Sequence, residues 1–399
     1  MKTNKSVSPI TRFLTAQTIS LMGSSIVQYA IIWHITLTTS SGKMLTLSTL
    51  CGFLPQILIA LFGGPLLDRF SRKTLVLCSD AAIALATLCL AISFLSGYRN
   101  DFLLFIVLMI RSAGTGIQNP AVNAIIPQLT PQDKLMKING INSTLSSLIM
   151  FISPAISGAI LSIFSIEYTL FLDVITAIIG ITITYTIDIP LLQPQHSQNY
   201  IQEIHQGFSY IRRHPQIRNL MIFQIIILFL ISPTAFLTPL MISRTFGDNV
   251  ILLTMSEMTY SLGMILGGIL ITVWGGFSEK RKTVCTAAGF YGLMMIGIGI
   301  SPIFVLYLLC NTLIGITSPL YNTPLTVIIQ EETDSKLHGR VFSFLQIATS
   351  CALPLGMSFF GPCADIIPPQ HLMVFSGILI LLFTTLVAFS SFLHSPSMS

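Results

Sequence analysis

The sequence has few charged residues. Of its 399 residues, 20 are Lys or Arg and 15 are Asp or Glu, so charged side chains make up 9% of the chain, against about a quarter in a soluble domain. An ordinary water-exposed surface is therefore excluded. A nucleic-acid-binding protein has no support either, because no face could collect enough basic side chains. A membrane β-barrel is excluded because segments of about ten residues with alternating polarity are missing.

The sequence also lacks the common motifs of metal, nucleotide and hydrolytic chemistry. Its seven cysteines form no C-x-x-C pair, so neither a zinc site nor a disulfide framework is indicated. No HExxH, GxSxG or Walker motif is present, and His and carboxylate residues do not cluster at ligand spacing. We therefore predict that the protein is not an enzyme and that it binds no metal and no cofactor.

Long apolar segments dominate what is present. Hydrophobic residues make up 52% of the chain, and the mean hydropathy is +0.80. A membrane-spanning helix needs about 20 residues at a rise of 1.5 Å each. Twelve segments meet this requirement, so we predict an all-α polytopic membrane protein; they are 12–38, 45–67, 74–96, 102–126, 138–163, 168–188, 219–243, 251–275, 284–300, 303–328, 340–366 and 371–394.

The distribution of basic residues predicts the orientation of these spans. If the N-terminus is cytoplasmic, sixteen of the twenty Lys and Arg residues fall on the cytoplasmic side, and only Lys43, Arg99 and Arg244 fall outside. Arg111 remains within a span. Because cytoplasmic loops carry an excess of basic residues, we expect a multi-pass protein of the bacterial inner membrane with both termini in the cytoplasm.

The chain is expected to form two related halves. Predicted domains are an N-terminal six-helix bundle (1–190), a cytoplasmic linker with a short amphipathic helix (191–218) and a C-terminal six-helix bundle (219–399). Gly63-Gly64 recurs as Gly267-Gly268, and a longer stretch repeats after about 202 residues. Duplicated halves are typical of transporters, with the binding site between the halves near the membrane midplane.

The loop between the second and third spans carries a motif. It reads Gly63-Gly64-Pro65-Leu66-Leu67-Asp68-Arg69-Phe70-Ser71-Arg72-Lys73 and resembles the signature loop of the major facilitator superfamily. The resemblance implies a cytoplasmic gate. In that gate Asp68 would face the N-terminus of the eleventh span near Arg340, and the basic residues would meet Glu331, Glu332 or Asp334. The predicted gate residues are Gly64, Asp68, Arg69, Arg72, Lys73 and Arg340.

Further stretches narrow the resemblance. Ser153-Pro154-Ala155-Ile156-Ser157-Gly158 resembles a degraded antiporter element, although a plain proline kink explains it equally well. The stretches 111–124, 257–268, 339–343 and 354–356 are similar to macrolide-efflux drug–proton antiporters of the superfamily. This resemblance implies two pseudo-symmetric six-helix bundles, the fold of the major facilitator superfamily.

Polar residues at helical spacing indicate a substrate pathway. On the fourth span, four such residues lie four apart, Arg111 through Asn123, and therefore share one face. Hydrogen bonds between helices are the alternative explanation for such polar faces. Aromatic and polar residues on other spans are added to the predicted substrate-binding set, which is Gln28, Phe53, Gln56, Thr115, Asn119, Asn123, Phe236, Tyr260, Tyr321 and Gln346.

Charges within spans are costly and are therefore treated as functional candidates. Glu257 is predicted to be the main proton-coupling group, with Arg111 as its electrostatic partner. For Asp173, proton coupling and a structural hydrogen-bonding role remain equally open. Asp80, near the inner end of the third span, is expected to join the cytoplasmic charge network.

The expected function is proton-coupled export of an amphipathic small molecule, drug-like or a secreted metabolite, by alternating access. The expected partners are that substrate, protons and the lipid bilayer, and the protein is expected to work as a monomer. Within transport, siderophore export and lysolipid flipping remain alternatives. A membrane-embedded enzyme and a non-transporting receptor are the alternatives from another class.

Overall fold

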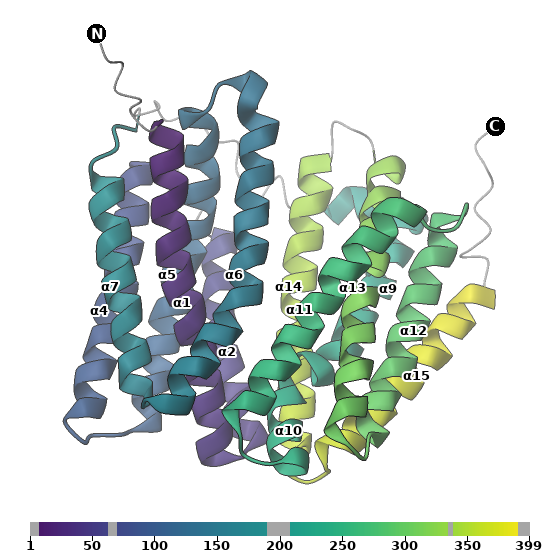
Figure 1. Cartoon of the computed structure of the whole chain (residues 1–399). Helices are drawn as coiled ribbons and strands as arrows, with labels where there is room; N and C mark the ends of the chain where they lie inside the picture. The colour runs from purple at the N-terminus through teal and green to yellow at the C-terminus, as the bar shows by residue number, and fades with distance from the viewer. Residues whose placement is uncertain (1–7, 63–69, 190–207, 334–337, 390–399) are drawn as a thin grey trace. The chain divides into compact units, whose positions relative to one another are not determined.

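The computed structural model describes residues 8–62, 70–189, 208–333 and 338–389 (Figure 1). In this part of the chain, twelve helices are long and apolar enough to cross a membrane, which confirms the predicted number of spans. The predicted amphipathic helix around 201–211 lies mostly outside the described residues. The motif residues 63–69 also lie outside them.

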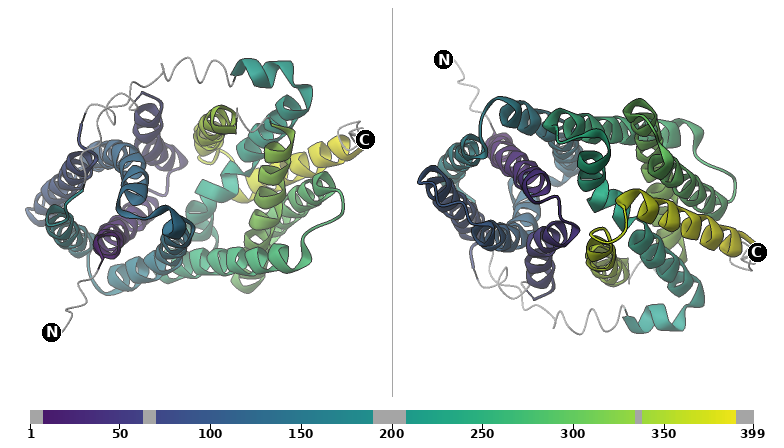
Figure 2. Two further views of the ribbon diagram at one scale, coloured as in Figure 1. Left: turned by 90° about the horizontal axis from the view of Figure 1, so that it is seen from above. Right: turned by 90° about the horizontal axis from the view of Figure 1, so that it is seen from below.

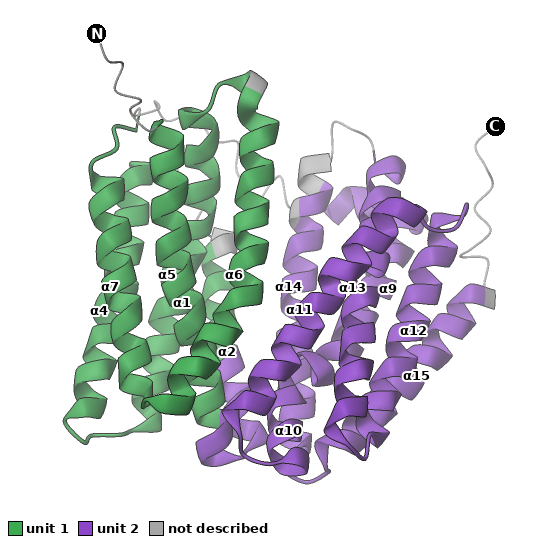
Figure 3. Cartoon of the chain, in the orientation of Figure 1, with its two compact units in different colours: residues 1–35, 50–197 green, residues 36–49, 198–399 purple. Residues whose placement is uncertain are grey.

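The chain folds as two compact units, coloured separately in Figure 3. Unit 1 comprises Met1–Ile35 and Leu50–Ser197, and unit 2 comprises Thr36–Thr49 and Gln198–Ser399. The segment Thr36–Thr49 contains the end of the first helix, the turn after it and the start of the second helix, and it packs with unit 2. Hydropathy does not predict this exchange, because it reports which segments span and not which segments they pack against.

Six described helices contribute to unit 1, the first two only outside Thr36–Thr49: α1 (Pro9–Thr39), α2 (Gly42–Phe62), α4 (Arg72–Leu95), α5 (Asp101–Leu129), α6 (Leu135–Ile163) and α7 (Ile166–Tyr185). Helix α4 packs against both α5 and α7. Helix α5 begins at a defined residue because the Asn100 side chain accepts a hydrogen bond from the Phe102 amide at 2.9 Å, satisfying a free N–H of the first turn. Figure 2 shows the helices of this unit end-on.

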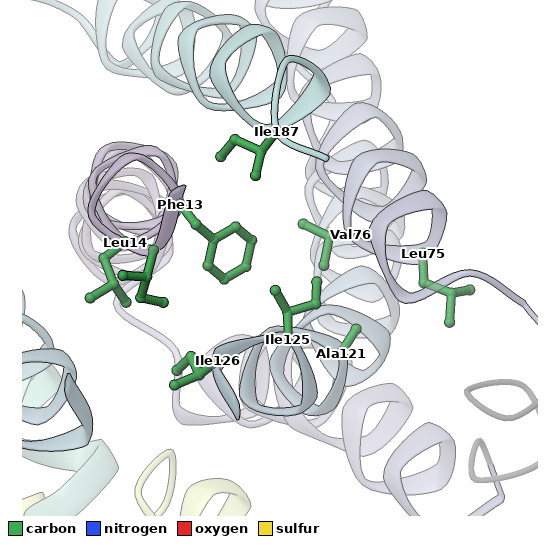
Figure 4. Close-up of a cluster of buried hydrophobic side chains, with 9 residues drawn as sticks. Phe13, Leu14, Leu75, Val76, Ala121, Ile125, Ile126 and Ile187 are labelled. Atoms are coloured by element: carbon green, nitrogen blue, oxygen red, sulfur yellow. The ribbon is translucent and has the colours of Figure 1, made fainter. Parts of the chain in front are cut away.

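An apolar cluster lies between the helices of unit 1 (Figure 4). Side chains from α1, α4 and α5 and from the residues after α7 meet there, and each is at most 8% exposed. Phe13 is completely buried in it. The members are Ile10, Phe13, Leu14, Leu75, Val76, Ala121, Ile125, Ile126 and Ile187. This cluster fixes the four helices that carry the polar groups described below.

Unit 2 contains α9 (Pro215–Ser232), η2 (Pro233–Leu237), α10 (Thr238–Phe246), α11 (Val250–Trp274), α12 (Lys280–Ile300), α13 (Phe304–Glu332), α14 (His338–Cys363) and α15 (Pro369–Phe389). The first three form one continuous span, Pro215–Phe246. Its middle section is a π-helical turn that begins at Pro233, where the missing proline N–H interrupts the regular hydrogen-bond ladder.

Glycine allows α11 and α13 to cross closely. A Cβ added to Gly263 would lie 2.1 Å from the Thr312 carbonyl oxygen, and one added to Gly315 would lie 2.3 Å from the Tyr260 carbonyl oxygen. Both contacts involve backbone atoms, which cannot rotate away. The crossing therefore requires residues without side chains at these positions.

Candidate functional site

A buried ion pair lies inside unit 1. The Arg111 guanidinium of α5 contacts the Asp173 carboxylate of α7, and the two side chains are 5% and 1% exposed. Thr87 of α4 joins them: its hydroxyl accepts from Arg111 Nη1 at 2.6 Å and lies 3.1 Å from Asp173 Oδ2. Because an unpaired charge in a membrane interior costs several kcal/mol, at least about 2.5–3.5, pairing is what allows both groups to be charged here.

Helix α1 completes this polar layer. The Ser24 hydroxyl donates to Asp173 Oδ1 at 3.0 Å, and the Ser24 carbonyl oxygen accepts from Arg111 Nη2 at 3.0 Å. Asp173 thus has hydrogen-bond or ionic partners on α1, α4 and α5. We call Arg111, Asp173, Thr87 and Ser24 the ion-pair layer.

A second polar layer surrounds Asp80 of α4, which is 2% exposed. Its Oδ1 accepts hydrogen bonds from Ser20 Oγ at 2.7 Å and from Gln118 Nε2 at 2.7 Å. Gln118 Nε2 also lies 3.4 Å from Gln17 Oε1. Asp80, Ser20, Gln118 and Gln17 are called the Asp80 layer below. The predicted role of Asp80 in a cytoplasmic charge network is wrong, because its partners are uncharged side chains inside unit 1.

The two layers are related by a constant spacing. Positions 17, 80 and 111 each have a partner in the other layer seven residues further on, at 24, 87 and 118. Seven residues are almost two helical turns, so the layers lie about 10 Å apart along the bundle. On α7 the position seven after Asp173 is Gly180, whose Cα packs against Ser20. The Asp80 layer therefore receives no side-chain polar group from α7.

The predicted polar face of the fourth span does not point in one direction. Arg111 is 4% exposed and turned into unit 1, whereas Asn119 and Asn123 are exposed. Thr115 donates to the Arg111 carbonyl oxygen of its own helix at 2.9 Å. Gln118, which sequence analysis missed, is the α5 residue that joins Arg111 inside the unit. The sequence signal that could have found Gln118 is its position seven residues after Arg111, which places both residues on nearly the same side of the helix.

Glu257 lies on α11 of unit 2, seven residues after the helix begins. The residue is partly buried. Among the described residues, none forms an ion pair or a hydrogen bond with its carboxylate. The structure gives Arg111 a different partner from the predicted one, because the guanidinium pairs with Asp173 within unit 1.

Next to Glu257 is a well-connected polar cluster. Ser256 and Tyr307 share a hydrogen bond at 2.5 Å, and Asn311 Nδ2 donates to the Ser256 carbonyl oxygen at 2.7 Å. These bonds hold α11 and α13 in register one residue before Glu257. The contrast between a satisfied Ser256 and an unpartnered Glu257 marks this turn of α11 as a candidate site.

The remaining predicted substrate residues lie in different surroundings. Tyr321 is 7% exposed, and its ring centroid is 6.3 Å from that of Phe223, so it belongs to the core of unit 2. Phe53 is 39% exposed. Gln346 is exposed, and its amide lies 3.2 Å from the Ser350 hydroxyl. The partly buried members are Gln28, Gln56, Thr115, Phe236 and Tyr260.

The predicted cytoplasmic gate is only partly described. Gly64, Asp68, Arg69 and the side chain of Arg340 lie outside the described residues. The expectation that Arg72 and Lys73 meet acidic groups of the other half stays a prediction; within unit 1 both side chains bind backbone carbonyl oxygens. Arg72 donates to the Ala124 carbonyl oxygen at 2.9 Å.

Lys73 donates to the carbonyl oxygens of Tyr185 and Ile187, both at 2.8 Å. The end of α7 carries a partial negative charge and free carbonyls, which attract this cation. Two of the predicted acidic partners form ion pairs within unit 2, Glu331 with Lys280 and Glu332 with Arg281, and Asp334 lies outside the described residues. Basic side chains that lie next to a helix end bind its carbonyls, which a search for acidic partners in the sequence does not consider.

A clasp in unit 2 holds the turn between α1 and α2. The Asp365 carboxylate accepts from the backbone N–H of Lys43 at 3.0 Å and from that of Gly42 at 2.5 Å, capping the start of α2. The Ser41 hydroxyl donates to it at 3.2 Å, and Arg244 forms an ion pair with it at 3.4 Å. We call these five residues the Asp365 clasp.

The contacts of the clasp determine the protonation state of the Asp365 carboxyl group. Burial raises the pKa of Asp365, but the hydrogen bonds from Gly42, Lys43 and Ser41 and the Arg244 charge outweigh it, so the pKa lies below its usual value. The ionised form is therefore the one that holds the turn. A Cβ on Gly42 would lie 2.1 Å from the Gly361 carbonyl oxygen, so the start of α2, which belongs to unit 2, also packs closely against α14.

Within the described ranges, no group of three or more His, Cys, Asp or Glu residues is arranged so that it could hold a metal ion.

Comparison with known proteins connects this architecture to a family. The model of the Major Facilitator Superfamily matches residues 13–357. Macrolide efflux protein A of Streptococcus pyogenes is 31% identical over 373 residues, which cover 92% of this chain and 91% of that protein. The Staphyloferrin A transporter of Staphylococcus aureus is 20% identical, with 89% of each chain covered.

Among solved structures, the POT family transporter PepTSo matches with a TM-score of 0.76 at 10% identity, over 95% of this chain and 97% of that chain. A likeness at this identity concerns the fold alone. Together these findings confirm the predicted resemblance and the predicted fold class.

Proposed function

The chain belongs to the major facilitator superfamily, and from this premise we propose that it exports an amphipathic small molecule of the macrolide kind. The observation that carries the proposal is the 31% identity to Macrolide efflux protein A of Streptococcus pyogenes over 92% of this chain. Because the family and these relatives are transporters, transport is proposed ahead of a membrane enzyme or a receptor. The proposed setting is the inner membrane, with a monomer whose termini are cytoplasmic.

We propose that export is driven by proton antiport through alternating access. One charge crossing 100 mV releases about 2.3 kcal/mol, which supports a gradient of roughly 50-fold for a neutral solute. A proton carrier must expose a carboxyl group to each side in turn. Glu257 suits this role because it is partly buried and has no partner among the described residues, so little must be broken to protonate it.

The proposal is tested by macrolide accumulation in a bacterium that lacks its own drug pumps. Cells expressing the protein should accumulate less labelled erythromycin than cells carrying the empty vector, and a protonophore should abolish the difference. Equal accumulation would reject macrolides as substrates. Export that persists with the protonophore would reject proton coupling.

Substitution of Glu257 by Gln tests the coupling group. Gln keeps the size and the hydrogen-bonding capacity but cannot titrate, so Glu257→Gln should retain macrolide exchange across vesicles and lose uphill export. Two measurements in everted vesicles are compared: erythromycin counterflow, which reports exchange, and ΔpH-driven erythromycin uptake, which reports uphill export. Glu279→Gln is the matched control, because this exposed acid lies just before α12, outside the spans, and pairs only with the exposed Lys282 among the described residues. If Glu257→Gln still builds a gradient, the coupling group lies elsewhere.

Siderophore export is the second candidate, supported by the similarity to the Staphyloferrin A transporter. The lower identity, 20% against 31%, places it after the macrolide proposal. Competition distinguishes the two in the same vesicles. Unlabelled staphyloferrin A that blocks erythromycin uptake would indicate a shared site, and transport of staphyloferrin A alone would replace the macrolide proposal.

A further inference from the structure

The interior of unit 1 contains an unequal number of charges. The buried charged side chains described in unit 1 are Arg111, Asp173, Asp80 and Glu167. Arg111 is committed to Asp173, and Glu167, at the start of α7, pairs with Arg99. Asp80 has no cation beside it, although only 2% of its surface is exposed. An ionised carboxylate at this position would be a buried charge without compensation, which costs several kcal/mol.

The other basic groups on the helices around Asp80 have partners of their own. Arg12 of α1 donates to Thr186 Oγ1 at 2.5 Å. Arg72 and Lys73, in the first turn of α4, bind the carbonyl oxygens of Ala124, Tyr185 and Ile187. Helix α7 carries no Lys or Arg.

The other acidic groups on these helices are remote from Asp80, apart from Asp173. Asp101 and Glu167 lie in the first turns of α5 and α7, about 20 Å or more along the bundle from the Asp80 layer. Asp173 of the ion-pair layer is the nearest acidic group among these, and its charge is compensated by Arg111.

The hydrogen bonds that Asp80 accepts fall on one of its two carboxyl oxygens. Both donors, Ser20 Oγ and Gln118 Nε2, approach the same oxygen, Oδ1. The other oxygen, Oδ2, is buried without a partner. An anion shares its charge between two oxygens and attracts donors to both, whereas an acid has one carbonyl oxygen and one hydroxyl group.

Gln17 offers the missing acceptor. Its Nε2 is also buried without a hydrogen-bond partner, and its side chain lies beside both Gln118 and Asp80. Turning the Gln17 amide would present its oxygen to a hydroxyl at Asp80 Oδ2. The long 3.4 Å contact between Gln118 Nε2 and Gln17 Oε1 would be given up, and a proton on Oδ2 would thereby give this buried oxygen a hydrogen-bond partner.

We propose that Asp80, held by Ser20, Gln118 and Gln17, is a proton-binding site inside unit 1, occupied in the conformation described here. The proton would leave to water when a change of conformation hydrates Oδ2 or brings a cation near, leaving the carboxylate behind. As a transport step this rests on the proposed proton antiport. A sodium ion fits less well, because two hydrogen-bond donors face Oδ1 where a hard cation requires oxygen ligands.

Infrared spectroscopy of the purified full-length protein tests the site without any substrate. Wild type should show a carboxylic acid C=O band that disappears reversibly at alkaline pH, and Asp80→Asn should lack this component. Glu257→Gln, measured in parallel, removes a different carboxyl and should leave the Asp80 component in place. A wild-type spectrum unaltered by Asp80→Asn would show that Asp80 is ionised and would overturn the proposal.

Two further measurements keep the result decisive. Ser20→Ala retains the carboxyl but removes one donor to Oδ1, so the band should shift in frequency even where Asp80→Asn does not fold; an unshifted band would contradict the assignment. Replacing choline chloride by sodium chloride should leave the band unchanged, and its loss in sodium alone would identify a sodium site instead.

Everted vesicles separate this inference from the proposed function. Asp80→Asn should lose ΔpH-driven erythromycin uptake and keep erythromycin counterflow. If wild type transports no erythromycin while the infrared band titrates, the proposed substrate fails and the proton site stands. If Asp80→Asn transports as wild type does in response to ΔpH, the site has no part in coupling.

Discussion

At the residue scale, the Arg111–Asp173 pair should dominate the stability of unit 1. Asp173→Asn leaves the Arg111 charge buried without compensation, which should destabilise the protein by about 3–5 kcal/mol. The double variant Arg111→Gln/Asp173→Asn buries no charge and should recover most of the loss. Thermal unfolding of the purified variants measures both effects. A double variant as unstable as the single one would show that the pair is not the source of the loss.

The same residues show what a sequence pattern can miss. A spacing of four put Arg111, Thr115, Asn119 and Asn123 on one stripe, yet Arg111 is buried and Asn119 and Asn123 are exposed. A helix turns 400° in four residues, so a stripe at this spacing drifts around the helix. The spacing of seven, which joins Arg111 to Gln118, drifts by half as much and follows the interior.

At the scale of elements, the Asp365 clasp predicts a dependence on pH. The pKa of Asp365 is lowered in the folded protein, so its contribution to stability is complete above the unfolded pKa and is lost as the pH falls through the folded pKa. Asp365→Asn at neutral pH should reproduce the acid condition. Hydrogen exchange of the Gly42 and Lys43 amides, corrected for the intrinsic rate at each pH, should accelerate in both cases.

The control for the clasp is Lys43→Ala, because only the backbone of Lys43 contacts Asp365. This variant should keep the wild-type protection. Equal protection of Gly42 in wild type and in Asp365→Asn would show that the carboxylate does not hold the turn.

The crossing of α11 and α13 gives a second prediction at this scale. Gly263→Ala places a methyl group 2.1 Å from the Thr312 carbonyl oxygen, so the helices must separate, at a cost of about 1–3 kcal/mol. Gly268→Ala is the matched control on the same helix, since nothing lies within 4 Å of its added Cβ. Melting temperatures should fall for the first variant and hold or rise for the second. A similar fall in both would attribute the effect to the helix itself.

At the scale of the whole molecule, the distribution of Lys and Arg predicts cytoplasmic termini. Green fluorescent protein fused to the C-terminus should fluoresce, and alkaline phosphatase fused there should be inactive, because each reporter works on one side of the membrane. Fusion of phosphatase after Arg99, in a connection predicted to lie outside, should be active. Active phosphatase at the C-terminus would reverse the predicted orientation.

The number, type and approximate bounds of the spans could be determined from the sequence alone. Twelve predicted segments correspond to twelve helices, because the cost of exposing backbone polar groups to lipid makes each long apolar run helical whatever its neighbours are. Family membership could also be recognised from the sequence, because the motifs that carry it are short and contiguous. Glu257 and Arg111 could be singled out because any charge within a span is rare.

Partners, in contrast, were decided by the tertiary structure. That Arg111 binds Asp173 rather than Glu257, that Lys73 binds the end of α7, and that Asp365 holds the start of α2 all depend on contacts between helices far apart in sequence. Apolar burial is non-directional and sets only which segments are buried. A hydrogen bond or ion pair requires two atoms within about 3 Å, and that distance exists only once the helices have packed.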